Sequence, residues 1–337
     1  MRSRATGLLL GALADAVLGD PRRGHPVAAF GAVAAALERR VHADRRLAGA
    51  GYTAVLVGGA VGLGIAAEAA GRGRPVLGAG LTALATWTVL GGSSLAGHGA
   101  ALAGELDAGD LTAARRRVPS LCGRDPESLD AAGMARAGVE SLAENTSDAV
   151  VAPLFWGAVA GVPGLLGYRA VNTLDAMVGY RSSRYRRFGW ASARLDDVAN
   201  LVPARVCAAL FAVLAPAVGG SPSVALAAWR RDAGGHPSPN AGPVEAAAAG
   251  ALGVGLGGRT VYAHGVEERP RLGSGPPPAP ADLHRAARLS RLVGAAAAVL
   301  AALSGAGAPR RRRRRRPGRG AGRCGRASRG AAAARGG

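Results

Sequence analysis

The chain has 337 residues, with 42 Lys+Arg against 22 Asp+Glu and a formal net charge of +20. All 42 basic residues are arginine, which excludes a lysine-dependent phosphate loop and a pyridoxal-phosphate enzyme. Twelve arginines and no acid lie in 309–337, so residues 1–308 carry 30 basic and 22 acidic side chains. Because the excess is concentrated in one segment, we expect no nucleic-acid partner.

The N-terminal segment has two interpretations. Arg2 and Arg4 precede a short apolar run at 7–13, as in a signal peptide. The run is weak, and Asp15 and Asp20 follow it directly. We therefore favour an uncleaved first helix that partly enters the membrane.

Several uncharged stretches are long enough to cross a bilayer, which takes about 20 apolar residues as a helix. Small residues in these stretches suit close helix packing in lipid. The sequence predicts an all-α, polytopic integral membrane protein with four to five transmembrane helices and polar helical loops. The stretches are 48–67, 75–97, 149–168, 206–229 (apolar mainly over 206–218) and 292–309.

The sidedness of the middle of the chain stays open. Arginines around the first two spans put 19–47 and 98–147 in the cytoplasm. A single span at 149–168 would then place 169–200, with six arginines, outside. Either the break at Val162-Pro163-Gly164 makes this stretch re-entrant, or the span count differs.

Two polar clusters precede the middle span. The first, over 19–27, contains Asp20 and His25 in a sequence typical of turns. The second places Glu140, Glu144 and Asp148 at i, i+4 and i+8, one above another on a helix, with Asn145 beside them. Stacked carboxylates repel unless they are solvated or bridged by a cation such as Mg²⁺. We favour a functional site over a solvated face.

Further polar clusters follow the middle span. Asn172 and Asp175 are spaced i, i+3, as are Arg194 and Asp197, and Asp196 and Asn200 are spaced i, i+4, so that each pair shares a helical face. The guanidinium groups of the arginines suit carboxylate or phosphate oxygens. Structural ion pairs are the alternative. A loop over 229–243 adds two more polar groups, and the GxGxxG at 253–258 follows no strand, which argues against dinucleotide binding. The residues singled out are Asn172, Asp175, Arg194, Asp196, Asp197, Asn200, Arg205, His236 and Asn240.

Cysteine and histidine spacing argues against other cofactors. The three cysteines, Cys122, Cys207 and Cys324, form no CxxC, and the histidines show no metal-binding spacing. We expect no disulfide framework, zinc or haem.

Taken together, these motifs resemble the CobD/CbiB family of cobalamin-biosynthesis proteins over about residues 7–305. The resemblance rests on the blocks GDPRRGHPV, VESLAENTSDAVVAPLFW, YRAVNTLDAMVGYRS, YRRFGWASARLDDVANLVPAR and HPSPNAGPVEAAAAGALGVGLGG.

The resemblance implies a multi-pass protein of the bacterial inner membrane with adenosylcobinamide-phosphate synthase activity. Such an enzyme links aminopropanol, or its O-phosphate, to the propionate carboxyl of adenosylcobyric acid through an amide. ATP and Mg²⁺ are expected cofactors, membrane lipid surrounds the protein, and other late-pathway enzymes are expected partners.

Hypothetical roles follow for the selected residues. The expected metal ligands are Glu140, Glu144 and Asp148. The expected catalytic residues are Glu140, Glu144, Asp175, Asp196 and Asp197. The expected substrate-binding residues are Asp20, His25, Asn145, Asn172, Arg194, Asn200, Arg205, His236 and Asn240.

Two other functions compete with an enzyme. A permease predicts inverted repeats, and the sequence shows no pair of similar halves. A non-catalytic membrane sensor on the same scaffold is the second alternative, but retention of all five polar blocks favours catalysis.

The C-terminal segment 309–337 departs from the family pattern. Arg310–Arg316 opens an Arg/Gly/Ala-rich stretch that we predict to be disordered, because it has few residues able to form a core. Its alternatives are a cytoplasmic tail drawn to anionic lipid and a frameshifted or read-through end. The membrane domain is expected over 1–308.

We predict that deleting 310–337 leaves activity intact, because no predicted site residue lies in that segment. Growth supported by the truncated chain in a bacterium lacking its own synthase measures this. Loss of growth, with the truncated protein still present in the membrane, would contradict it.

Overall fold

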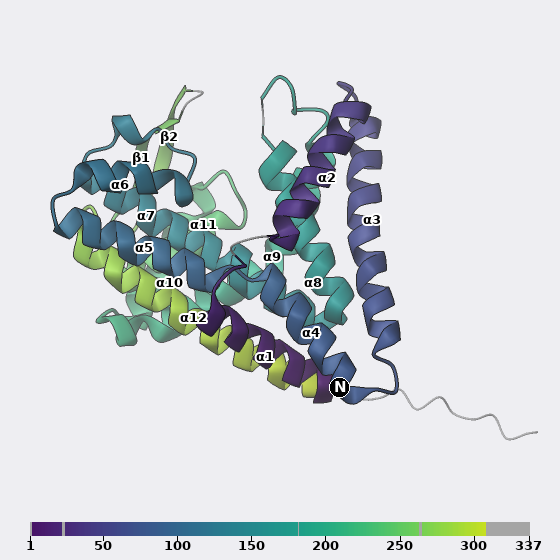
Figure 1. Ribbon diagram of the computed structural model, residues 1–337. Helices are drawn as coiled ribbons and strands as arrows, with labels where there is room; N and C mark the ends of the chain where they lie inside the picture. The colour runs from purple at the N-terminus through teal and green to yellow at the C-terminus, as the bar shows by residue number, and fades with distance from the viewer. Residues whose placement is uncertain (1, 22–23, 181, 263–264, 308–337) are drawn as a thin grey trace, which may run out of the picture. The chain divides into compact units, whose positions relative to one another are not determined.

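The computed structural model describes residues 2–21, 24–180, 182–262 and 265–307. The compact unit that they form extends over Met1–Gly307. The predicted tail at 309–337, with its expected disorder, lies outside the described residues. As predicted, the fold is helical, although it also contains one β-hairpin (Figure 1).

The helices and strands follow in chain order. Short 3-10 turns connect several of them, and a π-helical turn over Ser147–Val151 joins α7 to α8. The elements are α1 Arg2–Leu18, α2 Pro26–Val41, α3 Arg46–Ala70, α4 Pro75–Val89, α5 Gly92–Asp107, α6 Leu111–Arg117, α7 Ala131–Thr146, α8 Ala152–Val178, α9 Trp190–Leu214, α10 Pro222–Asp232, α11 Ala241–Leu252, β1 Leu256–Tyr262, β2 Gly265–Leu272 and α12 Pro280–Gly307.

Five helical segments within the described residues are long and apolar enough to cross a membrane, which agrees with the predicted four to five. The first helix, α1, is present as predicted and packs against α4 and α12. At 17 residues it is not one of the five. The five segments are Arg46–Ala70, Pro75–Asp107, Ala131–Val178, Trp190–Val218 and Pro280–Gly305.

The third segment is broken inside α8 at Gly161, two residues before the predicted Pro163-Gly164 break. Gly161 has φ +70° and ψ −146°, a conformation that L side chains rarely adopt. Beyond the break the N–H of Val162 donates to Glu68 Oε1 at 3.2 Å, and Arg4 pairs with the same oxygen at 3.2 Å. Pro163 lies in the first turn of the new helix, where a backbone N–H has no intrahelical partner, so the missing N–H of proline costs nothing there.

The two halves of α8 are antiparallel and lie side by side. Twenty-four residues of straight helix would separate Asp148 from Asn172 by about 36 Å. Yet Asn172 Nδ2 lies 3.5 Å from Asp148 Oδ2, and Tyr168 Oη lies 3.2 Å from the Asp148 carbonyl oxygen. The chain therefore folds back at Gly161, and the re-entrant alternative for 149–168 is the one that the structure supports.

The fold-back also fixes which ends of the helices lie together. His42 Nε2 lies 3.2 Å from the Arg184 carbonyl, and Arg184 pairs with Glu38 at 2.8 Å. Arg187 lies 3.6 Å from Asp44. Residues 182–189 therefore lie at the same end as the α2–α3 turn, contrary to what a single straight span at 149–168 would require.

The predicted acidic stripe is interrupted where α7 meets the π-helical turn. Glu140 and Glu144 lie on α7, whereas Asp148 lies in the π-helical turn. A π turn adds a residue per hydrogen-bonded ring and so rotates the following side chains out of the α-helical phase. Glu144 and Asp148 still line one polar cavity, whereas Glu140 lies outside it.

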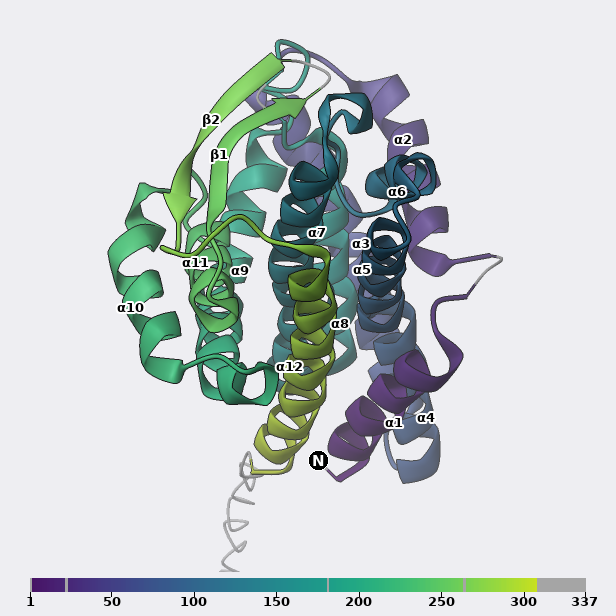
Figure 2. The ribbon, with the colours of Figure 1, turned by 90° about the vertical axis from the view of Figure 1, so that its left-hand side faces the viewer.

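The hairpin was not predicted. β1 and β2 pair antiparallel, with Arg259 opposite Glu268, and Figure 2 shows the hairpin rising beside α11. Gly257 and Gly258, at the start of β1, have φ near +80°. The glycine motif thus links the end of α11 to a strand, and in the described chain no strand precedes it, as the sequence indicated.

Replacing Gly161 with alanine is predicted to destabilise the fold by at least about 1–2 kcal/mol, the cost of a left-handed non-glycine residue. A Cβ there would also collide with the Glu68 carboxylate. Thermal unfolding of the detergent-purified protein measures the loss. Gly58→Ala is the matched control, because its Cβ would meet nothing within 4 Å. Equal melting temperatures for the two variants would contradict the account.

Candidate functional site

A polar cavity of 720 Å³ lies where α8, α9 and α11 meet the π-helical turn and β2. It gathers eight of the residues selected from the sequence, although they come from four separate segments. These are Glu144, Asp148, Asp175, Arg194, Asp196, Asp197, Asn200 and Asn240. Ser147, Ser238, Glu267 and Glu268 also line it.

The inner wall of the cavity is a hydrogen-bonded network centred on Asp196. Asn200 Nδ2 donates to Asp196 Oδ2 at 3.0 Å, one turn away on α9 as predicted. Tyr168 Oη donates to Asn200 Oδ1 at 2.9 Å and thereby fixes which way the amide points. The three side chains are almost fully buried, so their partners hold them in one arrangement.

Asn172 joins this network to the π-helical turn. Its Nδ2 lies 3.4 Å from Asp196 Oδ1 and 3.5 Å from Asp148 Oδ2, and Arg169 donates to its Oδ1 at 3.4 Å. Asn172 does not itself line the cavity, but it holds two of the carboxylates that do. Asn172, which the sequence analysis lists among the expected substrate-binding residues, orients these carboxylates in the structure.

The rim of the cavity is held by contacts between α9 and the start of α11. Arg194 pairs with Asp197 at 3.5 Å, the predicted i, i+3 pair. Asn240 Nδ2 donates to the Asp197 carbonyl at 2.8 Å, and Arg205 donates to Asn240 Oδ1 at 3.0 Å. Arg205 therefore contacts a cavity residue without lining the cavity.

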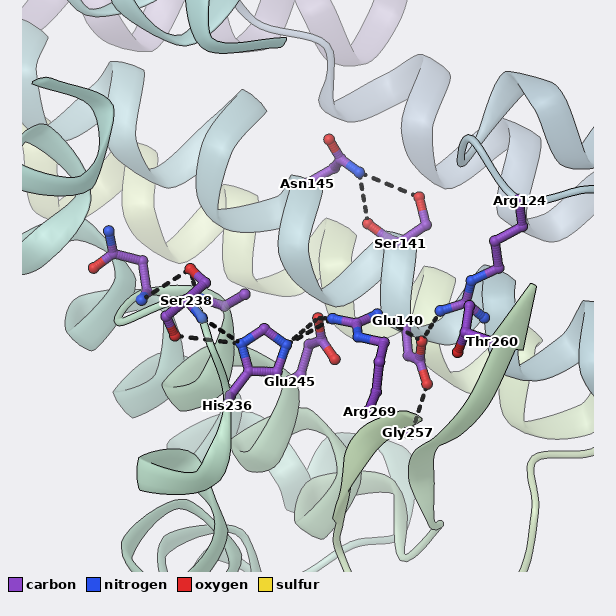
Figure 3. Close-up of polar contacts among 12 residues, drawn as sticks. Arg124, Glu140, Ser141, Asn145, His236, Ser238, Glu245, Gly257, Thr260 and Arg269 are labelled. Atoms are coloured by element: carbon purple, nitrogen blue, oxygen red, sulfur yellow. Dashed lines mark hydrogen bonds and ion pairs between the residues drawn. The ribbon is translucent and has the colours of Figure 1, made fainter. Parts of the chain in front are cut away.

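Glu140 lies outside the cavity, in a buried ionic network that holds the hairpin (Figure 3). Its Oε1 accepts from the Gly257 N–H at 2.7 Å, and its Oε2 pairs with Arg124 and with Arg269 at 3.2 Å. Both oxygens are thus engaged by the protein. Within the described ranges, no three His, Cys, Asp or Glu side chains are grouped closely enough to hold a metal ion. The expected set of Glu140, Glu144 and Asp148 does not fit a shared metal site for this reason.

His236 belongs to the same network rather than to the cavity wall (Figure 3). Arg269 lies 2.6 Å from His236 Nε2 and donates to Glu245 Oε1 at 3.0 Å. Because arginine can only donate, Nε2 accepts, and Nδ1–H is left to donate to the Ser238 carbonyl. Burial, reinforced by the charge of Arg269, lowers the pKa of His236 and keeps it neutral.

The structure places three selected residues elsewhere. Asn145 donates to the Ser141 carbonyl on its own helix (Figure 3). His25 caps α2 by accepting from the Val27 N–H at 3.2 Å, a structural role. Asp20 follows α1 and does not line the cavity.

Several site residues were missed by the sequence analysis. Tyr168 and Ser147 lie inside the quoted blocks. A tyrosine at the end of an apolar run and a single serine do not by themselves indicate a polar network. Glu267 and Glu268 reach the cavity only because the hairpin brings them there. The hairpin itself could have been suspected from the glycine-rich stretch before it.

The chain resembles proteins of one family over most of its length. It matches the family described as "CobD/Cbib protein" over residues 8–290. It is 57% identical to "Cobalamin biosynthesis protein CobD" of Mycobacterium tuberculosis (strain ATCC 25618 / H37Rv) over 298 residues, covering 88% of this chain and 94% of that protein. The protein of the same description in Rhodobacter capsulatus (strain ATCC BAA-309) is 46% identical over 82% of this chain and 90% of its own length. No solved structure matches significantly.

The stability of the ionic network is predicted to fall as the pH rises. Burial raises the pKa of Glu245 to about 8, well above its ordinary value of 4.5. Between these two values the folded protein keeps a proton that the unfolded chain has lost, so folding is favoured at the acidic end. Melting temperatures measured from pH 5 to 9 should fall more steeply for the native chain than for Glu245→Gln. Parallel curves would contradict this assignment.

Proposed function

Because the chain belongs to the CobD/CbiB family of cobalamin-biosynthesis proteins, we propose that it forms the amide between adenosylcobyric acid and aminopropanol or its O-phosphate. The product is adenosylcobinamide or its phosphate. The observation that carries the proposal is the polar cavity, which gathers eight residues from the family-like blocks. An acidic, amide-lined site suits an amine substrate.

The propionate carboxylate is a poor electrophile and must be activated before an amine can attack it. The propionate oxygen attacks the γ-phosphorus of ATP, ADP leaves, and an acyl phosphate forms. The neutral amine then attacks the acyl carbon, inorganic phosphate leaves, and the amine proton passes to a base. Mg²⁺ bound with ATP would neutralise phosphate charge, and few protein carboxylates would be needed to hold it.

The cavity residues have distinct parts in this scheme. Asp175 and Glu144 present carboxylates that can accept the proton released by the attacking amine. Asp196 is fixed by Asn172 and Asn200, so its charge stays aimed at the bound amine. Arg194 at the rim is a partner for an anionic group of the substrate.

The position of the arginines favours access from the cytoplasm of a bacterial cell. Arg184 pairs with Glu38 near the end of α2, and Arg187 contacts Asp44 in the α2–α3 turn; this end of the bundle also carries Arg39, Arg40 and Arg45. Asp175 and Arg194 lie near the ends of α8 and α9 that meet this arginine-rich end. Positively charged loops remain on the cytoplasmic side of the inner membrane, where ATP is available.

A non-catalytic sensor or a permease on this scaffold remains the competing function. A permease also uses buried ionisable residues such as Asp196, so the observation that favours catalysis is membership of a family described as cobalamin-biosynthesis proteins. Other late-pathway enzymes that dock at the membrane would be compatible with catalysis.

The decisive genetic experiment uses a bacterium that lacks its own synthase and is supplied with cobyric acid. The native chain is predicted to restore cobalamin-dependent growth, and Asp196→Asn to reduce it by at least about tenfold in rate. Asp196→Asn keeps the shape of the side chain but removes its charge. Glu127→Gln is the control, since Glu127 is an exposed acid outside the cavity.

Growth on cobinamide shows that the rest of the pathway works in the test strain. Growth on cobinamide but not on cobyric acid, with the native chain inserted in the membrane, would contradict the proposed reaction.

A further inference from the structure

The charge of the cavity restricts what can fill it. Its described lining contains seven carboxylates and a single basic side chain, Arg194. An anion without a counterion would be repelled by this wall, because like charges interact strongly where water is limited. The molecule that occupies the inner part must bring positive charge.

A buried hydroxyl in the same wall lacks a strong partner. Ser147 is 2% exposed and lines the cavity, and its Oγ makes no regular hydrogen bond among the described residues; its polar neighbour is the buried thiol of Cys207, a weak hydrogen-bonding group. A buried polar group without a partner costs about 1–3 kcal/mol. A donor on a bound ligand would remove that cost.

The amide nitrogen of Asn172 contacts two carboxylates of this wall, and both contacts are long. Asp148 and Asp196 both face Asn172 Nδ2, at the long distances of 3.5 Å and 3.4 Å. Their oxygens retain capacity to accept stronger hydrogen bonds. An aliphatic ammonium has three donors, which match two carboxylates and one hydroxyl.

The rim offers the opposite charge. Arg194 leaves 70% of its side chain exposed, and its ion pair with Asp197 is long, at 3.5 Å. A guanidinium so placed can pair with a phosphate through two parallel hydrogen bonds. The cavity is therefore acidic inside and has its one basic group at the rim.

We propose that this cavity binds the aminoalcohol phosphate end to end, with its ammonium between Asp148 and Asp196 and its phosphate on Arg194. The assignment rests on the proposed function, which makes an aminoalcohol the second substrate. It adds that the amine and phosphate ends are recognised by different residues. Arg194 then sets the preference for the phosphorylated substrate over the free aminoalcohol.

Calorimetric titration of the purified full-length chain tests this without ATP or corrinoid. The probes are 1-aminopropan-2-ol, its O-phosphate, and 1,2-propanediol phosphate, which lacks the amine. Asp196→Asn should weaken binding of both amines at least about tenfold, or about 1.4 kcal/mol. Arg194→Ala should weaken the O-phosphate by a similar factor and leave the free aminoalcohol within about twofold.

Matched controls keep the result interpretable. Glu127→Gln should bind all three probes as the native chain does, because it lies outside the cavity. If Asp196→Asn has a lower melting temperature than the native chain, Asp148→Asn provides a second test of the amine site.

Unchanged amine binding in both folded aspartate variants would overturn the proposal. The proposal would also be overturned if the aspartate variants lost the binding of Mg²⁺, titrated alone, while both amines still bound to them. An Arg194→Ala variant that weakens both amines equally would overturn the end-to-end orientation. Failed rescue from cobyric acid alongside the predicted binding pattern would instead contradict the proposed reaction alone.

Discussion

The contact between Asn172 and Asp148 is the constraint on which the site depends. The two residues are 24 positions apart in one helical segment, and a straight helix would keep them about 36 Å apart. Folding back at Gly161 brings them to 3.5 Å and places both beside Asp196 of α9. Without that reversal, the π-helical turn and the end of α8 could not line one cavity.

The reversal needs its own stabilisation inside an apolar bundle. It exposes a helix terminus whose N–H groups have no intrahelical partners, and such groups are costly away from water. Glu68 of α3 accepts from Val162, and Arg4 of α1 neutralises the same carboxylate. Two neighbouring helices thus supply the charges that the break requires.

A second buried ionic network supports the other side of the cavity. Glu140 is held by the Gly257 N–H and by two arginines, and Arg269 continues to Glu245 and His236. Removing one member of a buried ion pair leaves an unpaired charge and is strongly destabilising. The network anchors β2, whose Glu267 and Glu268 complete the cavity wall. Glu140 is therefore a positioning residue in this account.

The sequence predicted the helical class, the number of possible spans and eight of the twelve polar residues that line the cavity, because apolar run length and local spacing carry that information. The i, i+3 pair Arg194–Asp197 and the i, i+4 pair Asp196–Asn200 are confirmed. Spacing along one helix could not show that Glu140 is turned toward the hairpin, because Gly257 and Arg269 lie more than a hundred residues away in β1 and β2.

The fold-back shows the same limit of sequence reasoning. The proline signalled a break, but only tertiary contacts with Glu68 and α9 decide that the chain reverses there.

A disulfide cross-link between residues 148 and 172 tests the central claim most directly. The variant carries D148C and N172C in a chain whose three native cysteines are replaced, and is oxidised in the membrane before proteolysis and mass spectrometry. The account predicts a rapid intramolecular disulfide, because the native side chains are in contact. Absence of this disulfide, while a D148C chain still reacts with a small thiol reagent, would contradict the fold-back and the cavity built on it.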